Sequence, residues 1–481
     1  MLVLDPKSKM PLYAQLYQQI REDISNGSIK VGTRLPSSRK LATDLRISRN
    51  TVELAYEQLS SEGFIKSRPR QGYYSELPPF EAPDKRAPSE AISPEADDSP
   101  EGNIIYDFQN KKVHSEDFPF DRWKKLVNRC FQEYKNGFLQ YGCPFGEPGL
   151  RSEIQRHIYN YRQVECKAKQ IIIGPGTQFC LELVCQLLKP SGTNAAMEDP
   201  GYAPTRTTFQ NNGFKIYPVE LDANGINVNL LNAVDAHAVY VTPSHQYPTG
   251  IIMPMDRRLE LVEWAKRKKT VIIEDDYNYS FQYDQKPLPS IHSLCSDRVI
   301  YMGSFSDILF PAIGVSYAVL PEHLLDRLCK RYCSDTTFVP FLTQKALELF
   351  FREGLLEKHV RKTIQQQRKK RNMLVSALKN ELGNHIRIIG EHAGLHLLVQ
   401  ATWEITGEEL INLAKQAGVS VQPTSDFRSW PQAEENGTVL LNYGGMKPEH
   451  IPIAVGLLRE AWLTGRTGAI KKIKTGSCNS C

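Results

Sequence analysis

The sequence predicts two folded units: a small winged helix-turn-helix at the N-terminus and a larger α/β domain, joined by an extended linker. In the first 75 or so residues, three short amphipathic helical patterns precede two strand-like runs. From residue 103 onward, apolar strand-like runs alternate with helical patterns, which is typical of α/β domains. A chain of 481 residues is also too long for a single core. The expected boundaries are 1–77 for the first unit, 78–102 for the linker, 103–465 for the α/β domain and 466–481 for a basic, cysteine-containing tail.

The composition indicates an ordinary soluble protein, with 41% hydrophobic and 23% charged residues. A net charge of +5 is mild, so the position of the charges matters more than their sum. The N-terminal apolar run is too short for a signal peptide. Since there is no run of ~18 apolar residues, no membrane span is predicted, and a cytoplasmic protein is expected.

The cysteines fit this compartment. Cys180 and Cys185 lie in one apolar helical run, and Cys329 and Cys333 lie four apart in another; all are interpreted as buried free thiols. The last pair, Cys478–Cys481, has C-x-x-C spacing but no second pair to complete a zinc site. We therefore expect a disordered tail there and predict no metal site.

The first unit has clear helix signals. Residues 10–26 place leucine and isoleucine at four-residue spacing, and Gly27 ends the pattern. Ser37 and Ser48 are predicted to cap a second and a third helix, with a tight turn at 46–47 between them. Gly63 ends the third helix. The runs 64–68 and 72–75 are predicted to form a hairpin, the wing.

Basic residues gather on this helix-turn-helix and its wing. In such motifs the start of the second helix enters the major groove of DNA, and Arg and Asn make bidentate contacts to bases. A wing can reach a neighbouring groove or phosphates. The alternative is a small helical bundle whose basic face is exposed to solvent and has no binding role. The candidate contacts to double-stranded DNA are Arg34, Arg39, Ser48, Arg49, Asn50, Thr51, Arg70 and Gly72.

These residues also carry a family resemblance. The motifs at 35–39 (LPSSR), 41–42, 48–52 (SRNTV) and 62–65 (EGFI) resemble the winged helix of GntR regulators. The resemblance implies that Arg39, Ser48, Arg49 and Gly72 contact an operator. Glu53 stands where the family often has a basic residue, so one phosphate contact is expected to be missing.

Three segments of the α/β domain have the form of ligand loops. The strand-like run 171–173 enters the glycine turn 174–178 and then a helix predicted over 179–188, which forms an anion cup. No Gly-Lys-Ser/Thr follows, so this is not a nucleotide P-loop. The run 271–273 ends in the acids of 274–276, at the edge where α/β sheets bind ligands. The loop 301–307 supplies glycine and serine hydroxyls but no lysine.

Further along, residues 355–382 predict a long basic helix, and 394–399 and 439–441 predict strands of a smaller subdomain. In order and spacing, these segments resemble an aminotransferase of fold type I. Together with the winged helix, the chain resembles the MocR subfamily of GntR regulators. The resemblance implies a large α/β domain plus a small α+β domain that binds pyridoxal phosphate and senses it or an amino compound. It also implies a head-to-tail homodimer that regulates transcription without substrate turnover.

The resemblance assigns pocket roles to individual residues. Tyr202 matches the aromatic that stacks on the cofactor ring, Asp275 the partner of the ring nitrogen, and Tyr277 the hydroxyl near the ring oxygen. Tyr247 is placed in the same pocket. The phosphate cup corresponds to Gly176, Thr177, Gln178, Ser304 and Ser306.

The chain departs from this family pattern at three positions. Asp307 stands where the Schiff-base lysine is expected, and Gly314 and Gly445 stand where arginines bind the phosphate and a substrate carboxylate. A carboxylate cannot form an imine. Losing a charged partner of a phosphate costs roughly 1.5–3 kcal/mol. No covalent cofactor and no aminotransferase activity are therefore expected.

Several alternatives remain for the pocket. It is expected to contain Asp275, Asp276 and Asp307, and it either senses a neutral or cationic molecule, binds pyridoxal phosphate non-covalently, or serves only as a dimer scaffold. The alternative to a regulator is a pyridoxal-phosphate enzyme that uses a different lysine.

Overall fold

The computed structural model describes residues 4–76, 104–109, 118–284, 286–332, 337–429 and 437–476. The chain divides into two compact units, Met1–Ser99 and Pro100–Cys481, and each is described by itself. The predicted linker 78–102, Cys333 and the Cys478–Cys481 pair lie outside the described residues.

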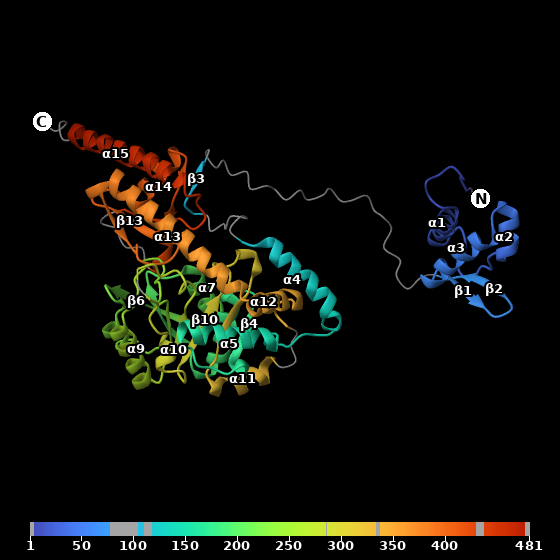
Figure 1. Cartoon of the computed structure of the whole chain (residues 1–481), viewed down its shortest axis with the longest axis horizontal. Coiled ribbons are helices and arrows are strands. Elements are labelled where there is room, and N and C mark those ends of the chain that lie inside the picture. The colour runs from blue at the N-terminus through green and yellow to red at the C-terminus, as the bar shows by residue number, and fades with distance from the viewer. Residues whose placement is uncertain are drawn as a thin grey trace. The chain divides into compact units, whose positions relative to one another are not determined.

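The first unit has the predicted winged-helix elements (Figure 1). Leu16, Ile20, Val52 and Leu59 are fully buried between the helices, which confirms the helical spacing. Its elements are α1 (Leu12–Ser25), α2 (Ser38–Leu45), α3 (Arg49–Ser61), β1 (Ile65–Arg68) and β2 (Gly72–Ser75).

Both predicted caps are present. The Ser37 hydroxyl accepts a hydrogen bond from the Lys40 N–H at 3.2 Å, and the Ser48 hydroxyl accepts one from the Thr51 N–H at 3.1 Å. Between the two helices, Arg46 ends α2 in the left-handed conformation, with φ of 56°. The turn thus fixes where α3 begins and which side chains stand on its first turn.

The second unit is built on an eight-stranded sheet of order β4-β11-β10-β9-β8-β5-β6-β7. Neighbouring strands from β10 to β6 are parallel, whereas β11 is antiparallel to both neighbours and β7 is antiparallel to β6. The bounds are β4 (Ile171–Gly174), β5 (Asn194–Asp199), β6 (Lys215–Asp222), β7 (Gly225–Ile226), β8 (Ala238–Val241), β9 (Val271–Asp275), β10 (Val299–Ser304) and β11 (Ser316–Val319).

Helices accompany this sheet. The helix after β4 begins at Thr177, two residues before the predicted start, because Gly176 already takes the N-cap position. The helices are α4 (Phe120–Glu133), η1 (Lys135–Leu139), α5 (Pro148–Arg162), η2 (Ala168–Gln170), α6 (Thr177–Leu188), η3 (Lys189–Ser191), α7 (Ala203–Asn211), α8 (Val228–Leu231), α9 (Met255–Lys268), α10 (Ile291–Leu294), η4 (Pro311–Ile313), α11 (Glu322–Tyr332) and α12 (Phe341–Arg352).

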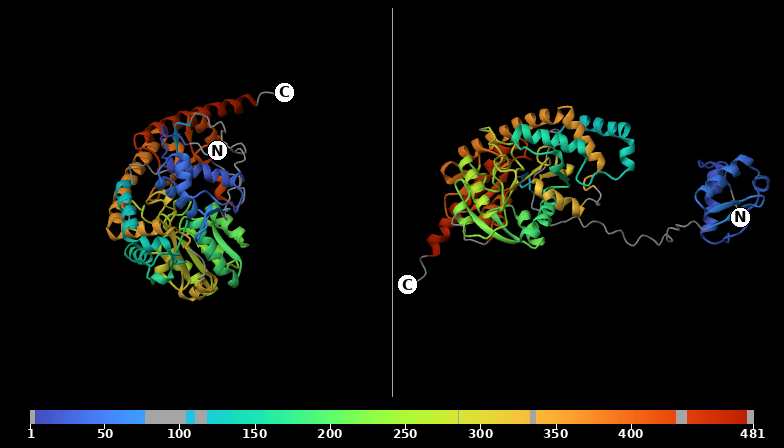
Figure 2. Two further views of the ribbon diagram at one scale, coloured as in Figure 1. Left: turned by 90° about the vertical axis from the view of Figure 1, so that its right-hand side faces the viewer. Right: turned by 90° about the horizontal axis from the view of Figure 1, so that it is seen from below.

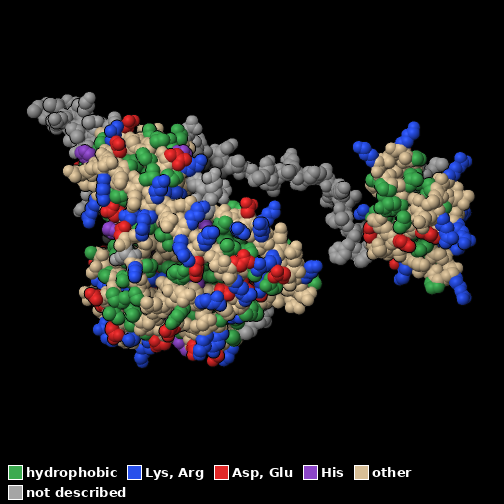
Figure 3. Space-filling view, viewed as in Figure 1, with side chains coloured by type: hydrophobic (Ala, Val, Ile, Leu, Met, Phe, Trp, Pro, Cys, Tyr) green, Lys and Arg blue, Asp and Glu red, His purple; other side chains and the backbone are tan. Residues whose placement is uncertain are grey.

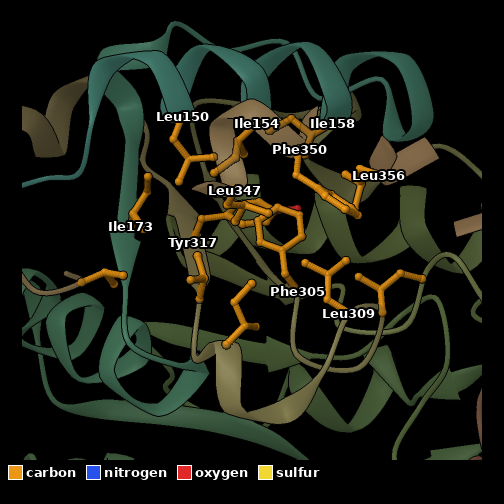
Figure 4. Close-up of a cluster of buried hydrophobic side chains, with 14 of the residues drawn as sticks. Leu150, Ile154, Ile158, Ile173, Phe305, Leu309, Tyr317, Leu347, Phe350 and Leu356 are labelled. Carbon is orange, nitrogen blue, oxygen red and sulfur yellow. The ribbon is translucent and has the colours of Figure 1, made fainter. Parts of the chain in front are cut away.

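One hydrophobic cluster fixes the loop that follows β10. Phe305 and Leu309 are buried together with Tyr317 of β11, beneath α5 residues that include Leu150 and Ile154 (Figure 4). With these anchors on either side, the intervening residues 306 and 307 are held in one place.

The smaller subdomain has the antiparallel sheet β12-β13-β16-β15 and a two-stranded sheet of β14 and β3. Leu374 and Leu378 of α13 pack with Leu458 and Trp462 of α15, while Leu356 of α13 belongs to the core of the large sheet, so this long helix spans both subdomains (Figures 1 and 2). The elements are β3 (Tyr106–Asp107), α13 (Leu355–Glu381), η5 (Gly383–His385), β12 (Ile386–Ile389), β13 (His396–Ala401), α14 (Gly407–Gln416), β14 (Val419–Ser420), β15 (Gln422–Pro423), η6 (Ser425–Phe427), β16 (Thr438–Asn442) and α15 (His450–Gly476).

Three further expectations were wrong in detail. The strand predicted from Gly394 begins at His396, because Gly394 turns with φ of +77° and a Cβ there would lie 2.0 Å from the His245 ring. The tail predicted from 466 is helical up to Gly476, because α15 is already formed and packed up to Trp462 and no proline follows to interrupt it. Cys329 is exposed, because it lies beside the buried Leu328 on another face of α11. Cys180 and Cys185 are buried, as predicted.

None of the helices in the described ranges has an apolar stretch sufficient to span a bilayer.

Candidate functional site

The first candidate site is the surface formed by the start of α3, α2 and the wing. All eight predicted residues are accessible on it: Thr51 is half-buried and the other seven are exposed. Lys and Arg side chains stand out from this unit in the space-filling view (Figure 3). The winged helix therefore presents exposed donors on the first turn of α3 and on the wing.

Two contacts shape this surface. The Arg49 guanidinium donates to Glu53 at 2.8 Å, so this acid pairs with a predicted DNA contact. The Arg34 side chain lies over Gly72, with its Nε 3.8 Å from where a Cβ would stand. Gly72 has φ of +95°, which favours glycine, so the wing and the segment before α2 meet here.

The second candidate site is a cavity of about 180 Å³ at the edge of the large sheet where β8, β9 and β10 end and α6 begins. The sheet gathers residues that are far apart in sequence, since parallel strands end at the same edge. Of the eleven residues predicted for the pocket, ten line it: Gly176, Thr177, Gln178, Tyr202, Tyr247, Asp275, Tyr277, Ser304, Ser306 and Asp307.

Three further residues line this cavity and were missed: Tyr240, Thr242 and Ser316. A sequence signal was available for the first two, since Tyr240 and Thr242 alternate along the end of β8 and so share a face. Ser316 stands directly opposite Ser304 in the antiparallel pair β10–β11, and this register was not visible in the sequence.

Of the three consecutive acids, only Asp275 lines the cavity. Asp276 was expected in the pocket, but it is fully buried and its carboxylate binds the Arg162 Nε at 2.5 Å and the Tyr301 hydroxyl at 2.7 Å. Glu274 accepts the N–H groups of Ile291 at 2.9 Å and His292 at 2.8 Å. Side chains alternate across a strand, so Glu274 and Asp276 support the scaffold while Asp275 faces the ligand side.

Asp275 is buried, and its two carboxylate oxygens differ in their hydrogen bonding. Its Oδ2 accepts a short hydrogen bond from the Tyr240 hydroxyl. Its Oδ1 has no hydrogen-bond partner within the described parts of the chain. Burial raises the pKa of Asp275 to about 7, and the charges of Asp276 and Asp307 act in the same direction.

Aromatic rings form one wall of the cavity. The centroids of Tyr202 and Tyr247 are 5.3 Å apart at 82°, and those of Tyr247 and Tyr277 are 6.4 Å apart at 75°. The Tyr277 hydroxyl donates to the His245 carbonyl at 3.1 Å. Burial lowers the pKa of His245 to about 4, so its imidazole is neutral at pH 7 and adds no cation here.

Serine and threonine hydroxyls also line the cavity. Ser316 donates to Ser304 at 3.0 Å and lies 3.5 Å from the Thr177 hydroxyl. Gly176 has φ of +116° and open space where a Cβ would point, and no side chain caps the start of α6. The first N–H groups of this helix therefore remain available to an acceptor or an anion.

Asp307 stands where the first cavity meets a second one of about 40 Å³. Tyr247 and Tyr277 also line both. His396, which also lines the second cavity, hydrogen-bonds the Pro248 carbonyl at 3.1 Å, consistent with a structural role. The other residues of the second cavity are Asn278, Gln367, Leu395, Asn442, Gly444 and Gly445.

The charged side chains that line the two cavities are all acidic. Among the described residues that line them, none is lysine or arginine, whereas Asp275 and Asp307 are acids. Within the described ranges, no cluster of three His, Cys, Asp or Glu side chains is arranged to hold a metal.

Comparison with known proteins supplies the family. Residues 12–74 match the model of bacterial regulatory proteins of the gntR family, and residues 108–456 match aminotransferase class I and II. The uncharacterized HTH-type transcriptional regulator YdeL of Bacillus subtilis (strain 168) is 37% identical over 454 residues, covering 94% of this chain and 97% of the relative. The chain belongs to the GntR family of transcription regulators that carry an aminotransferase-like domain.

Further relatives agree. The probable rhizopine catabolism regulatory protein MocR of Rhizobium meliloti is 31% identical over 478 residues, and the match covers 96% of each chain. Among solved structures, LysN, an α-aminoadipate aminotransferase of Thermus thermophilus complexed with N-(5′-phosphopyridoxyl)-L-leucine, has a TM-score of 0.67 at 25% identity. This match covers 76% of this chain and 93% of LysN. The regulator therefore combines a GntR winged helix, which implies DNA binding, with an aminotransferase-like fold.

Proposed function

We propose that this regulator reads an operator with its winged helix and uses its aminotransferase-like domain as a non-catalytic sensor and dimerisation module. Arg39 and the first-turn residues of α3 would enter the major groove, with Arg34 and the wing on the flanking backbone. The accessibility of this whole set supports the assignment. The proposed DNA contacts are Arg34, Arg39, Ser48, Arg49, Asn50, Thr51, Arg70 and Gly72.

The single observation that carries the non-catalytic role is that the described residues lining the pocket include acids but no lysine or arginine. Asp307 lines the cavity at the position where the family resemblance expects the imine-forming lysine. Gly445, at a position expected to be arginine, lines the second cavity and supplies no charge. Gly314, at the other position expected to be arginine, ends the turn of η4 after the serine loop and supplies none either. The residues present therefore do not fit a covalently bound pyridoxal phosphate, and we derive no step through that group.

A second candidate, an enzyme that uses a different lysine, rests on Lys370. Its side chain is buried, and its ammonium donates at 2.8 Å to the carbonyl of Gly444, which lines the second cavity. An ammonium held in this way is a poor nucleophile, because imine formation needs the neutral amine. We therefore favour the regulator.

We also propose that the regulator acts as a homodimer with a head-to-tail arrangement. Large apolar side chains are exposed along residues 120–141, among them Phe120, Phe131, Leu139 and Tyr141. Leu139 and Tyr141 keep 85% and 89% of their accessible surface, which is unusual for a folded monomer. Sedimentation velocity of the purified chain measures its assembly directly.

The DNA-binding assignment is tested by footprinting the full chain on DNA upstream of its own gene and of a divergent neighbour, at stated salt. Protection of a defined site above non-specific binding is expected. Binding no stronger than to unrelated DNA at the same salt would overturn it.

The non-catalytic role is tested by the visible absorption spectrum before and after pyridoxal phosphate is added and dialysed away. We expect only free-aldehyde absorbance, which dialysis removes. An imine band that survives dialysis and is fixed by borohydride would show that another lysine has taken over, and the same measurement on Lys370→Ala would identify whether it is Lys370.

A further inference from the structure

An apolar side chain is exposed on the helix that is proposed to enter the major groove. Within residues 38–61, which the structure describes throughout, Leu54 of α3 is the one large apolar side chain that is exposed, and it keeps 48% of its accessible surface. It is not part of the hydrophobic core of the first unit. A single exposed leucine is ordinary on a protein surface, so its importance depends on where it stands and on its neighbours.

Leu54 lies on the face of α3 that points away from the core. Since successive residues of an α-helix are about 100° apart, Asn50 and Leu54 lie about 40° from each other and roughly opposite the buried face. Residues at i and i+4 are also neighbours on a helix surface. The amide of Asn50 and the side chain of Leu54 therefore stand next to each other on one exposed strip. The residues of the buried face are Val52, Ala55, Tyr56 and Leu59.

The charged neighbours are held to one side of this strip. The Arg49 guanidinium donates to a carboxylate oxygen of Glu53 at 2.8 Å, and the Ser38 hydroxyl donates to the same oxygen at 3.3 Å. Ser38 is the first residue of α2, so Glu53 is turned toward the other helix of the motif. The first two turns of α3 thus present an amide and an apolar group at the middle of the exposed face.

An amide and an apolar side chain are complementary to adenine and thymine in the major groove. Adenine offers the N7 acceptor and the N6 donor, which an asparagine amide contacts together, and thymine offers its 5-methyl group to an apolar side chain. Cytosine lacks this methyl group and has an N4 donor beside the position, which Leu54 cannot accept. A donor that loses water without gaining a partner costs free energy. Leu54 therefore favours thymine over cytosine.

The spacing along α3 limits the spacing along the DNA. Four helical residues span about 6 Å, and neighbouring base pairs are about 3.4 Å apart, so the two side chains reach base pairs that are at most about two steps apart.

We propose that Asn50 and Leu54 read the operator together: the amide binds an adenine, and Leu54 packs on the methyl group of a thymine within about two base-pair steps. This inference rests on the proposed DNA-binding function. It adds to that function a specificity-determining residue, Leu54, that lies outside the predicted set of DNA contacts.

The test removes single methyl groups from the DNA. In the operator duplex defined by footprinting, each thymine of the protected site is replaced in turn by deoxyuridine, which lacks the 5-methyl group and keeps the hydrogen-bonding groups of thymine. Binding of the full chain is measured by fluorescence anisotropy at fixed salt. At least one replacement is expected to weaken binding roughly fourfold, since burial of one methyl-sized group gives a factor of this size.

The matched variants are Leu54→Ala and Met10→Ala. Leu54→Ala keeps a residue that favours helices and is expected to bind the thymine and deoxyuridine duplexes equally. Met10 is 44% exposed and precedes α1, so Met10→Ala removes an apolar side chain of similar exposure and is expected to keep the thymine preference. Because the contact is apolar, this preference is expected to be the same at low and at high salt, unlike the contribution of phosphate contacts.

The spacing is tested with 7-deazaadenine, which lacks the N7 acceptor. The adenine bound by Asn50 is the one whose replacement weakens binding of the unaltered chain but not of Asn50→Ala. It is expected within about two base-pair steps of the sensitive thymine.

The inference is overturned if no thymine of the protected site responds to loss of its methyl group or if the response persists in Leu54→Ala. It is also overturned if no adenine depends on Asn50, or if that adenine lies farther from the sensitive thymine. In each of these cases, specific operator binding by the unaltered chain leaves the proposed function standing. Binding no stronger than to unrelated DNA at the same salt overturns the proposed function itself, and this is measured before any base is replaced.

Discussion

The winged helix and the ligand pocket are assembled in contrasting ways. The DNA-binding surface comes from one contiguous stretch, in which caps at Ser37 and Ser48 position nearby exposed side chains. The pocket comes from segments spread between residues 176 and 316, and buried polar contacts such as Arg162–Asp276 support its strands. Local rules therefore decide the first site, whereas long-range packing decides the second, and perturbations of the two are expected to differ in kind and size.

The largest effect is expected from Arg162→Met. Arg162 is fully buried, and its Nε lies 2.5 Å from the Asp276 carboxylate behind the pocket. Removing it leaves a buried charge without its partner, which costs about 3–5 kcal/mol. Urea unfolding of the full chain measures the loss. The control is Lys167→Ala, which removes an exposed pair with Glu322 and is expected to cost at most about 1 kcal/mol. Similar losses in both variants would contradict a special role for buried contacts.

A smaller, pH-dependent effect is expected from Asp275→Asn. Burial raises the pKa of Asp275 to about 7, so between pH 4 and 7 the folded state keeps a proton that the unfolded state has lost. The stability due to this group is present at low pH and is lost as pH rises toward 7. Relative to the unaltered chain, the variant is expected to gain about 2 kcal/mol between pH 5 and pH 7. Unfolding curves at the two pH values measure this; a constant difference would contradict it.

The winged helix gives a third prediction. Ser48→Ala removes the cap of α3 and is expected to cost about 1 kcal/mol of stability. Ser37→Ala removes the corresponding cap of α2 and serves as the control. If Ser48 also contacts DNA, Ser48→Ala lowers operator affinity by more than Ser37→Ala does, although both substitutions remove a helix cap. Equal affinity losses in the two variants would leave Ser48 with a structural role alone.

The smallest effect is expected from Glu53→Ala. Glu53 pairs with the exposed Arg49, and such a pair contributes at most about 1 kcal/mol. Removing it frees Arg49 and deletes a negative charge beside the proposed DNA contacts of α3, so DNA affinity is expected to rise, most strongly at low salt. Fluorescence anisotropy over a salt series measures the change. The control is Glu322→Gln, an acid of the other unit, and a fall in affinity in Glu53→Ala would contradict the assignment.

Most elements were predicted from local sequence. The three helices of the first unit, the wing and the long helix α13 follow the expected spacing and caps. Errors occurred where context overrides local preference. Gly394 turns because the His245 ring occupies the space a side chain would need, and α15 continues to Gly476 beyond the packed Trp462.

Local spacing and residue identity are enough to predict the two kinds of unit, the polar residues at the start of α3 and the acid at 307. Which acids face the cavity depends on how the strands pack. The pleat of β9 turns Asp275 toward the cavity and sends Asp276 to Arg162, and the β10–β11 register brings in Ser316. Strand direction and register depend on partners far away in the chain, so no local pattern contains them.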